Sequence, residues 1–224
     1  MSDVLNKLKP VIDQTILKLS KPDFRSDPIG GKFAFITSVI SSAYKRHGAI
    51  LEEALVERLK ECRHLTVLTE SAFPISSRAN TLANQSGKDL DITAETNLPF
   101  ETKNPARTLQ IDCIVYNKKK RSISSYEIKR GNGNFDAGKK RSIRNDLLST
   151  NFLLKNYGKS KGLDVKKSYS YIICYYGLRA LPVPFSLIKE ELDSHFGASI
   201  VKEVEQVNEY FKNSLHSLIE KKTK

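Results

Sequence analysis

The sequence predicts an α/β fold in which helices flank a central mixed β-sheet. Two β-type runs, at 108–116 and 122–129, are joined by a short basic turn. A helical pattern covers 139–157, and an aromatic and β-branched run follows at 168–176. With one helix and one strand upstream, the expected order of the core is α-β-β-β-α-β, with additional helices at the C-terminus.

The N-terminal part of the chain is predicted to be helical. A weak apolar pattern reaches Lys21 and is interrupted by Pro10, and the stretch KPDFRSDPIGGK then breaks the chain. A strong helical pattern runs from Phe33 to about Arg63. Its second half places an apolar stripe on one face, formed by Leu51, Leu55 and Leu59.

The middle of the chain alternates between strands and polar segments. A short strand is expected at Leu65–Phe73. The polar section Ser76–Arg107, which contains Pro99 and Pro105, is expected to be mostly loop.

The helix at 139–157 has a clear apolar stripe, and Gly158 is its expected stop. The break LRALPVPF follows the aromatic run, and two closing helices are expected near Ser186–His195 and Ala198–Lys221. The predicted buried stripe consists of Ile143, Leu147, Thr150 and Leu154.

The expected organisation is one domain spanning 1–224. It comprises a helical arm at 1–32, a catalytic core at 33–176 and C-terminal helices at 177–224. The sequence has no apolar stretch long enough to cross a bilayer and no secretory signal pattern. Three scattered cysteines fit buried thiols, so a cytoplasmic protein without a membrane association is expected.

The charge of the chain points to a polyanionic partner. The net charge is +12, and basic residues cluster at 118–121, at 139–144 and between Lys155 and Lys167. Nucleic acid is the simplest partner for such a surface. A merely solvated surface explains the charge equally well, whereas an anionic membrane is disfavoured because no basic amphipathic helix exposes aromatic side chains.

The two β-type runs carry the residues of a candidate active site. If they form a hairpin that turns at Lys119-Lys120, Asp112 lies opposite Glu127, and Lys129 shares their face. Two facing carboxylates are destabilising unless a cation joins them. Carboxylate oxygens suit Mg²⁺, and a divalent ion with a nearby ammonium supplies what phosphodiester hydrolysis needs.

A second Glu-x-Lys sequence occurs at Glu101 and Lys103. Pro99 and Pro105 bracket it, and no apolar alternation supports a central strand there. It is therefore expected to be an exposed loop, and YEIKRG is the better candidate.

The chain resembles the PD-(D/E)XK nuclease superfamily, which includes many type II restriction endonucleases. The matching residues are Asp112 in LQIDCIV, with Glu127 and Lys129 in YEIKRG. The order of elements matches from about Phe33 to Tyr176, although Gln110-Ile111-Asp112 replaces the usual Pro-Asp pair. The resemblance implies a restriction-endonuclease-like core, Mg²⁺-dependent cleavage of DNA and often a homodimer.

GAILEEAL resembles the G-x-x-L-E helix signature of the same superfamily, which would make Glu52 the additional catalytic and metal-binding acid. On a helical wheel, Glu52 lies at the border of the leucine stripe, and Gly48 would let the helix pack closely. A plain carboxylate on the helix surface is nearly as good an interpretation.

Further site residues follow from the same comparison. The Ile128 carbonyl would bind metal as it does in relatives, and Gln110 could face the site. The expected cofactor is Mg²⁺, for which Mn²⁺ would substitute. Phosphate contacts are assigned to a set of basic residues, with a solvated helix face as the alternative: Arg130, Lys139, Lys140, Arg141 and Arg144.

The expected function is a Mg²⁺-dependent endonuclease that cuts double-stranded DNA, of the type II restriction kind. In this interpretation, Asp112 and Glu127 bind the metal and Lys129 activates or orients water. A repair, recombination or mobile-element nuclease has the same core motifs, and a non-catalytic DNA-binding protein is the alternative from another class. RNA is a weaker candidate substrate. Expected partners are a second copy of the chain and, for a restriction enzyme, a cognate methyltransferase.

Overall fold

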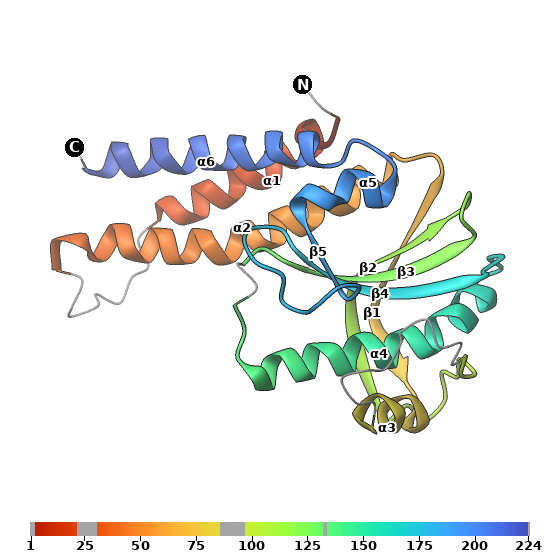
Figure 1. Ribbon diagram of the computed structural model, residues 1–224. Helices are drawn as coiled ribbons and strands as arrows, with labels where there is room; N and C mark the ends of the chain where they lie inside the picture. Colours follow the sequence, from red (N-terminus) through yellow and green to blue (C-terminus); the bar gives the residue numbers. More distant parts are fainter. Residues whose placement is uncertain (1–2, 22–30, 86–96, 132–133, 224) are drawn as a thin grey trace. The chain divides into compact units, whose positions relative to one another are not determined.

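The computed structural model describes residues 3–21, 31–85, 97–131 and 134–223 (Figure 1). The chain divides into two compact units, one formed by Met1–Arg58 and Phe196–Lys224 and the other by Leu59–His195. The expectation of one nuclease domain stays a prediction. The long helix that was expected to open the catalytic core lies mostly in the first unit.

The first unit is built from helices that lie side by side in Figure 1. Lys7 and Glu57 form an ion pair at 3.5 Å, and the buried His47 and Asn208 side chains form a hydrogen bond of 3.0 Å. These contacts join helices from both ends of the chain. The elements are α1 (Asp3–Ser20), the short 3₁₀ helix η1 (Gly31–Phe33), α2 (Ala34–Lys60) and α6 (Val201–Thr223).

The three long helices confirm the sequence predictions, with end points that differ by a few residues. Pro10 lies inside α1, and Leu51, Leu55 and Leu59 are buried on α2 as expected. The break expected after Lys21 falls largely on residues 22–30, which lie outside the described residues. The expectation that Gly48 lets α2 pack closely is wrong, because no described atom lies within 4 Å of a Cβ built there.

The second unit contains a five-stranded mixed sheet in the spatial order β1-β2-β3-β4-β5. β2 pairs antiparallel with both β1 and β3, whereas β4 pairs parallel with both β3 and β5. The predicted mixed α/β sheet is therefore confirmed. Its strands are β1 (Leu65–Ile75), β2 (Arg107–Asn117), β3 (Ser122–Lys129), β4 (Lys167–Cys174) and β5 (Ser186–Ile188).

Two helices cover one face of this sheet, α3 (Ser77–Gln85) and α4 (Ala137–Ser160) (Figure 1). The predicted stripe of α4 is buried throughout, from Ile143 to Leu154. It packs against sheet residues such as Ile114, Ile123 and Ile172. The side chain of Asp136 caps the start of α4 by accepting a 2.8 Å hydrogen bond from the Lys139 N–H.

Gly158 does not end α4, which continues to Ser160. A Cβ atom at this position would lie 2.6 Å from Cγ2 of Val165 and 3.0 Å from Cδ1 of Ile123. The glycine therefore permits close packing of the last helical turns on the sheet. The chain leaves the helix at Gly162, whose φ of +76° suits glycine.

Two other expectations differ in part from the local structure. The polar section Ser76–Arg107 is loop at 97–106 as expected, but it also contains α3, which is held because Ala79 and Ala83 are buried on its inner face. The expected helix at Ser186–His195 begins as strand β5, because Ser186–Ile188 pairs with Ile172–Cys174. The 3₁₀ helix η2 (Lys189–Glu191) and the short α5 (Leu192–Phe196) follow it.

None of the helices in the described ranges combines the length and the apolar character needed to cross a bilayer. The three cysteines are buried thiols outside any disulfide bond, as expected.

Candidate active site

The hairpin of β2 and β3 has the predicted register. Five residue pairs run from Asn117↔Ser122 to Cys113↔Tyr126, so the hairpin turns about Lys119-Lys120. The regular pairing stops at Cys113↔Tyr126, and the next residues on the two strands are Asp112 and Glu127. The negative charge of Glu127 raises the pKa of Asp112, so the two carboxylates lie near each other.

The backbone around Asp112 is irregular on the side of β1 as well. Between the pairs Leu68↔Ile114 and Glu70↔Ile111, β2 advances by three residues while β1 advances by two. The extra residue falls at Asp112–Cys113, which is the arrangement of a β-bulge. Bulges redirect side chains at the edge of regular pairing, and here the bulge occurs at the first acid of the site.

The Asp112 carboxylate lies where β2 and β3 stop forming a regular ladder. Its Oδ2 accepts a hydrogen bond of 2.7 Å from the backbone N–H of Ile128. Burial, and next the negative charge of Glu127, raise the pKa of Asp112, whereas the Ile128 hydrogen bond and the Lys129 charge lower it. The first two effects prevail, so the site raises the free energy of the ionised carboxylate and favours a cation beside it.

Glu127 and Lys129 leave β3 on the same face and contact each other. The distance between Lys129 Nζ and Glu127 Oε1 is 2.5 Å, and their side chains are 36% and 32% exposed. The ion pair is therefore open to solvent and to a ligand. The structure brings together Asp112, Glu127 and Lys129, as the sequence indicates.

The Ile128 backbone faces the Asp112 side chain. In a strand, the N–H and C=O groups of one residue point toward the same neighbour, and those of the next residue point to the other side. The carbonyl of Lys129 accepts from Tyr175 beyond β4, and the N–H of Ile128 binds Asp112. The Ile128 carbonyl is thus directed toward β2, where the expected metal position would be.

The donor set fits a Mg²⁺ ion better than a softer metal. No group of three or more His, Cys, Asp or Glu side chains that could hold a metal ion occurs among the described residues. Mg²⁺ is often held by one or two carboxylates and retains several waters. Asp112, Glu127 and the Ile128 carbonyl supply oxygen ligands only, which is the chemistry this ion requires.

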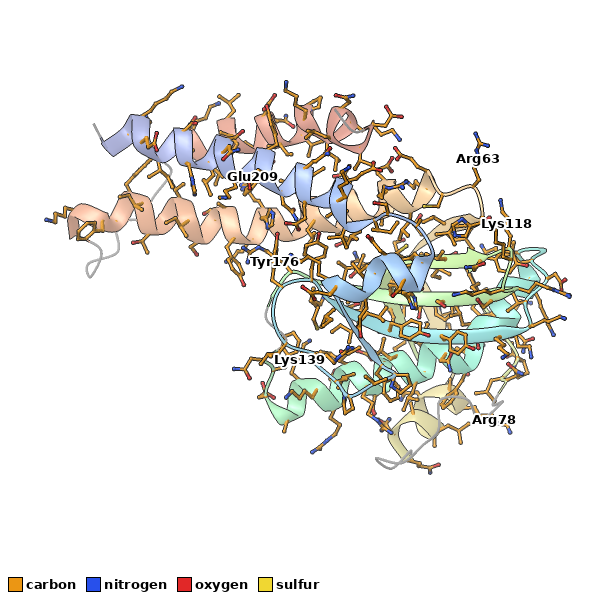
Figure 2. The ribbon with its side chains drawn as sticks, turned by 45° about the horizontal axis from the view of Figure 1, so that its top comes forward. Arg63, Arg78, Lys118, Lys139, Tyr176 and Glu209 are labelled. Atoms are coloured by element: carbon orange, nitrogen blue, oxygen red, sulfur yellow. The ribbon has the colours of Figure 1, made fainter. Side chains whose placement is uncertain are left out.

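A pocket of about 170 Å³ adjoins Glu127 on the face of the sheet that α4 covers. Lys139 at the start of α4 lines it together with Gln110, and Ile143 and Leu147 form part of its apolar wall. Figure 2 shows the Lys139 side chain at the first turn of α4. Lys139 and Gln110 are therefore brought to the same pocket as Glu127, as expected.

The other basic residues of α4 do not line this pocket. Lys140 is partly buried and Arg141 is exposed, and the Arg144 guanidinium lies 5.7 Å from the centre of the Phe185 ring. Residues at positions 139, 143 and 147 follow one helical stripe, and the three basic residues lie outside it. Their phosphate contacts stay a prediction.

Arg130 belongs to a cluster that the sequence did not indicate. Its guanidinium carbon lies 5.4 Å from the centre of the Tyr176 ring. Lys189 Nζ lies 5.8 Å from the centres of the Tyr175 and Tyr176 rings. The Tyr176 N–H donates to the Arg130 carbonyl at 3.3 Å. Two cations and an aromatic ring therefore gather directly after the Lys129 end of β3.

Sequence reasoning missed Lys189 because it lies far along the chain in a segment that was expected to be helical. Only the pairing of β5 with β4 brings it back to the end of the sheet. The sequence predicts that Tyr175 and Tyr176 belong to a buried strand. That holds for Tyr175, which is 1% exposed, whereas Tyr176 lies partly exposed beyond the end of β4.

Another acid near the pocket has a structural partner. Asp146 on α4 also lines the pocket, and its carboxylate forms a 2.6 Å ion pair with Arg107 at the start of β2. Arg107 also donates to Asn80 of α3 at 3.0 Å. These contacts fix α3, α4 and β2 together and give the carboxylates of the site a rigid support.

Glu52 lies on α2 in the first unit, at the edge of the buried leucine stripe and partly buried as expected. Its role as an additional acid stays a prediction. Glu101 and Lys103 of the second Glu-x-Lys sequence are exposed and lie outside any strand or helix, which confirms the expectation of a loop.

No family model, no curated protein and no solved structure matches this chain. The resemblance to PD-(D/E)XK nucleases therefore stays a prediction.

Proposed function

We propose that this protein is a Mg²⁺-dependent endonuclease that hydrolyses phosphodiester bonds in double-stranded DNA, of the restriction type. The observation that supports it most is that the regular pairing of the hairpin ends one residue before Asp112 and Glu127, with Lys129 in contact with Glu127. The pKa of Asp112 is raised by burial and by the charge of Glu127, so a cation bound beside the two carboxylates would stabilise their ionised forms.

Each residue of the site has a distinct task in this proposal. Asp112, Glu127 and the Ile128 carbonyl would hold the ion, and the Ile128 N–H fixes the orientation of the Asp112 carboxylate. A bound Mg²⁺ would stabilise the charge that develops on the phosphate and make water a stronger nucleophile. The Lys129 ammonium, 2.5 Å from Glu127, is placed to orient that water by donating a hydrogen bond.

The bond changes balance without a further reactant. A water oxygen bonds to phosphorus and releases a proton to solvent, one P–O ester bond breaks, and the leaving alkoxide takes up a proton from solvent. The net charge of +12 and the presence of Lys139 beside Glu127 support a polyanionic substrate. Arg130 and Lys189 supply further positive charge at the same end of β3.

Cleavage of plasmid DNA tests this function. The protein is expected to cut the plasmid with Mg²⁺ or Mn²⁺ and to leave it intact with EDTA. Lys129→Ala is expected to slow cleavage by about 10²- to 10⁴-fold, the usual effect of losing a group that positions or transfers a proton. Lys103→Ala in the exposed Glu-x-Lys loop is the matched control and should cut at the wild-type rate.

The products also separate the candidate roles. Discrete fragments indicate a sequence-specific restriction enzyme, whereas a smear indicates a nonspecific or structure-directed nuclease of the repair or recombination kind. If the unmodified protein cuts no DNA substrate with either ion, the proposal is wrong and a non-catalytic DNA-binding protein becomes the better conclusion.

A further inference from the structure

Two basic clusters that lie far apart in the sequence meet at one end of the sheet. Lys118, Lys119 and Lys120 form the turn between β2 and β3, whereas Lys166 and Lys167 precede or open β4. Ser122 pairs with Lys167, and the Lys166 N–H donates to the Arg121 carbonyl at 2.7 Å. The parallel register therefore sets the two clusters side by side.

Arg63 joins them from the segment before β1. Lys118 Nζ donates to the Arg63 carbonyl at 3.1 Å, and the Lys118 N–H donates to the His64 carbonyl at 2.9 Å. Figure 2 shows Arg63 and Lys118 at the same end of the second unit, with Lys139 at the opposite end. These basic residues together are called the hairpin-end surface, which consists of Arg63, Lys118, Lys119, Lys120, Lys166 and Lys167.

The charge of this surface is not compensated within the described chain. All six residues are exposed, and none of them forms an ion pair with a residue that the structure describes. Arg121, in contrast, is paired with Asp164. Six neighbouring cations repel one another, and a bound polyanion relieves that repulsion.

We propose that the hairpin-end surface is a second binding site for the phosphate backbone of double-stranded DNA, separate from the candidate active site. Glu127 lies five residues beyond Ser122 on β3, so the two sites are about 17 Å apart along the strand. That distance corresponds to about five base pairs of duplex. The surface would therefore bind phosphates that flank the one being cut.

The choice of DNA as the partner rests on the proposed function, but the surface itself does not. A membrane is disfavoured because a membrane-binding surface needs apolar side chains beside its cations. The large exposed apolar residues among those described, such as Phe33, Tyr44 and Leu178, come from other segments of the chain.

Binding of a DNA duplex to charge-reduced variants tests this site. The triple variant Lys119→Gln, Lys166→Gln and Lys167→Gln removes three exposed cations whose side chains form no hydrogen bond or ion pair with a described residue. A control, Lys202→Gln, Lys221→Gln and Lys222→Gln, removes three exposed cations from α6 and gives the same net charge. Fluorescence anisotropy in EDTA measures the dissociation constant over a range of salt concentrations, without cleavage.

The hairpin-end variant is expected to bind at least about tenfold more weakly and to lower the slope of log K against log salt by about 2 to 3. The α6 control should change the dissociation constant by less than about twofold. Equal effects in both variants, or none in the first, would overturn the proposal. A loss of binding to anionic vesicles with unchanged DNA binding would also overturn it, in favour of a membrane surface.

Because this assay needs no cleavage, its outcome is independent of the proposed catalysis. A protein that cuts DNA while both variants bind equally contradicts only the hairpin-end site. A protein that never cuts DNA, but whose hairpin-end variant binds more weakly than the control, contradicts only the proposed enzyme.

Discussion

Asp112→Asn is expected to reduce Mg²⁺-dependent DNA cleavage by at least about 10³-fold. Asparagine can still accept the hydrogen bond from the Ile128 N–H, which Asp112 accepts at 2.7 Å, so the local backbone is retained. The lost feature is the negative charge that would hold the ion beside the phosphate. Metal ions contribute several kcal/mol of transition-state stabilisation, and about 4 kcal/mol corresponds to that factor.

The same variant is expected to be more stable than the wild type without metal. Burial and the Glu127 charge raise the pKa of Asp112 from its ordinary value of 3.8, so the ionised carboxylate destabilises the folded state. This loss of stability is absent below the unfolded pKa and develops as the pH rises through the folded pKa. Removing one facing like charge stabilises a sheet by up to about 1 kcal/mol, or about 2–4 °C in melting temperature.

Melting curves in EDTA at neutral and acidic pH check this result. The gain for Asp112→Asn should be present at pH 7 and should disappear below pH 3.8, where wild-type Asp112 is neutral as well. Adding Mg²⁺ should stabilise the wild type and leave the variant unchanged. A variant that melts lower than the wild type at pH 7 would show that Asp112 is structural rather than a strained ligand.

Gly158→Ala is expected to lower the free energy of unfolding by up to about 2 kcal/mol, although alanine favours helices. The new Cβ would lie 2.6 Å from Cγ2 of Val165 and 3.0 Å from Cδ1 of Ile123. Overpacking of this kind costs about 1–3 kcal/mol, whereas the helix propensity of alanine returns about 1 kcal/mol. Because Val165 is β-branched and 4% exposed, its side chain cannot rotate away freely.

Gly48→Ala is the matched control within a helix. No described atom lies within 4 Å of the added Cβ, so this change should raise the free energy of unfolding by about 0.5–1 kcal/mol. Urea denaturation measures both variants. Combining Gly158→Ala with Val165→Ala should recover at least about 0.5 kcal/mol relative to additive effects. If Gly158→Ala is as stable as Gly48→Ala, close packing at Gly158 is contradicted.

The parts of the fold that the sequence predicts are those whose pattern is local. The β2–β3 hairpin follows from two alternating runs and a short turn, and this fixes the register, which ends one residue before Asp112 and Glu127. The apolar stripe of α4 follows from a spacing that is visible over four turns. Local patterns therefore suffice for the candidate carboxylate pair and its lysine.

The parts that the sequence does not predict depend on distant partners. Ser186–Ile188 becomes a strand because β4 offers an edge for pairing, and this brings Lys189 to Tyr176. The polar segment of α3 is helical because two alanines face the core. The bulge at Asp112 depends on the register with β1, which no local pattern sets.

The location of a bound Mn²⁺ ion tests the central claim most directly. Mn²⁺ replaces Mg²⁺ at oxygen sites, and its anomalous X-ray scattering identifies its position in crystals soaked with the ion. We expect one ion within about 2.1 Å of carboxylate oxygens of both Asp112 and Glu127, and no such ion in crystals of Asp112→Asn. An ion bound elsewhere, with the space between Asp112 and Glu127 vacant at saturating Mn²⁺, would contradict it.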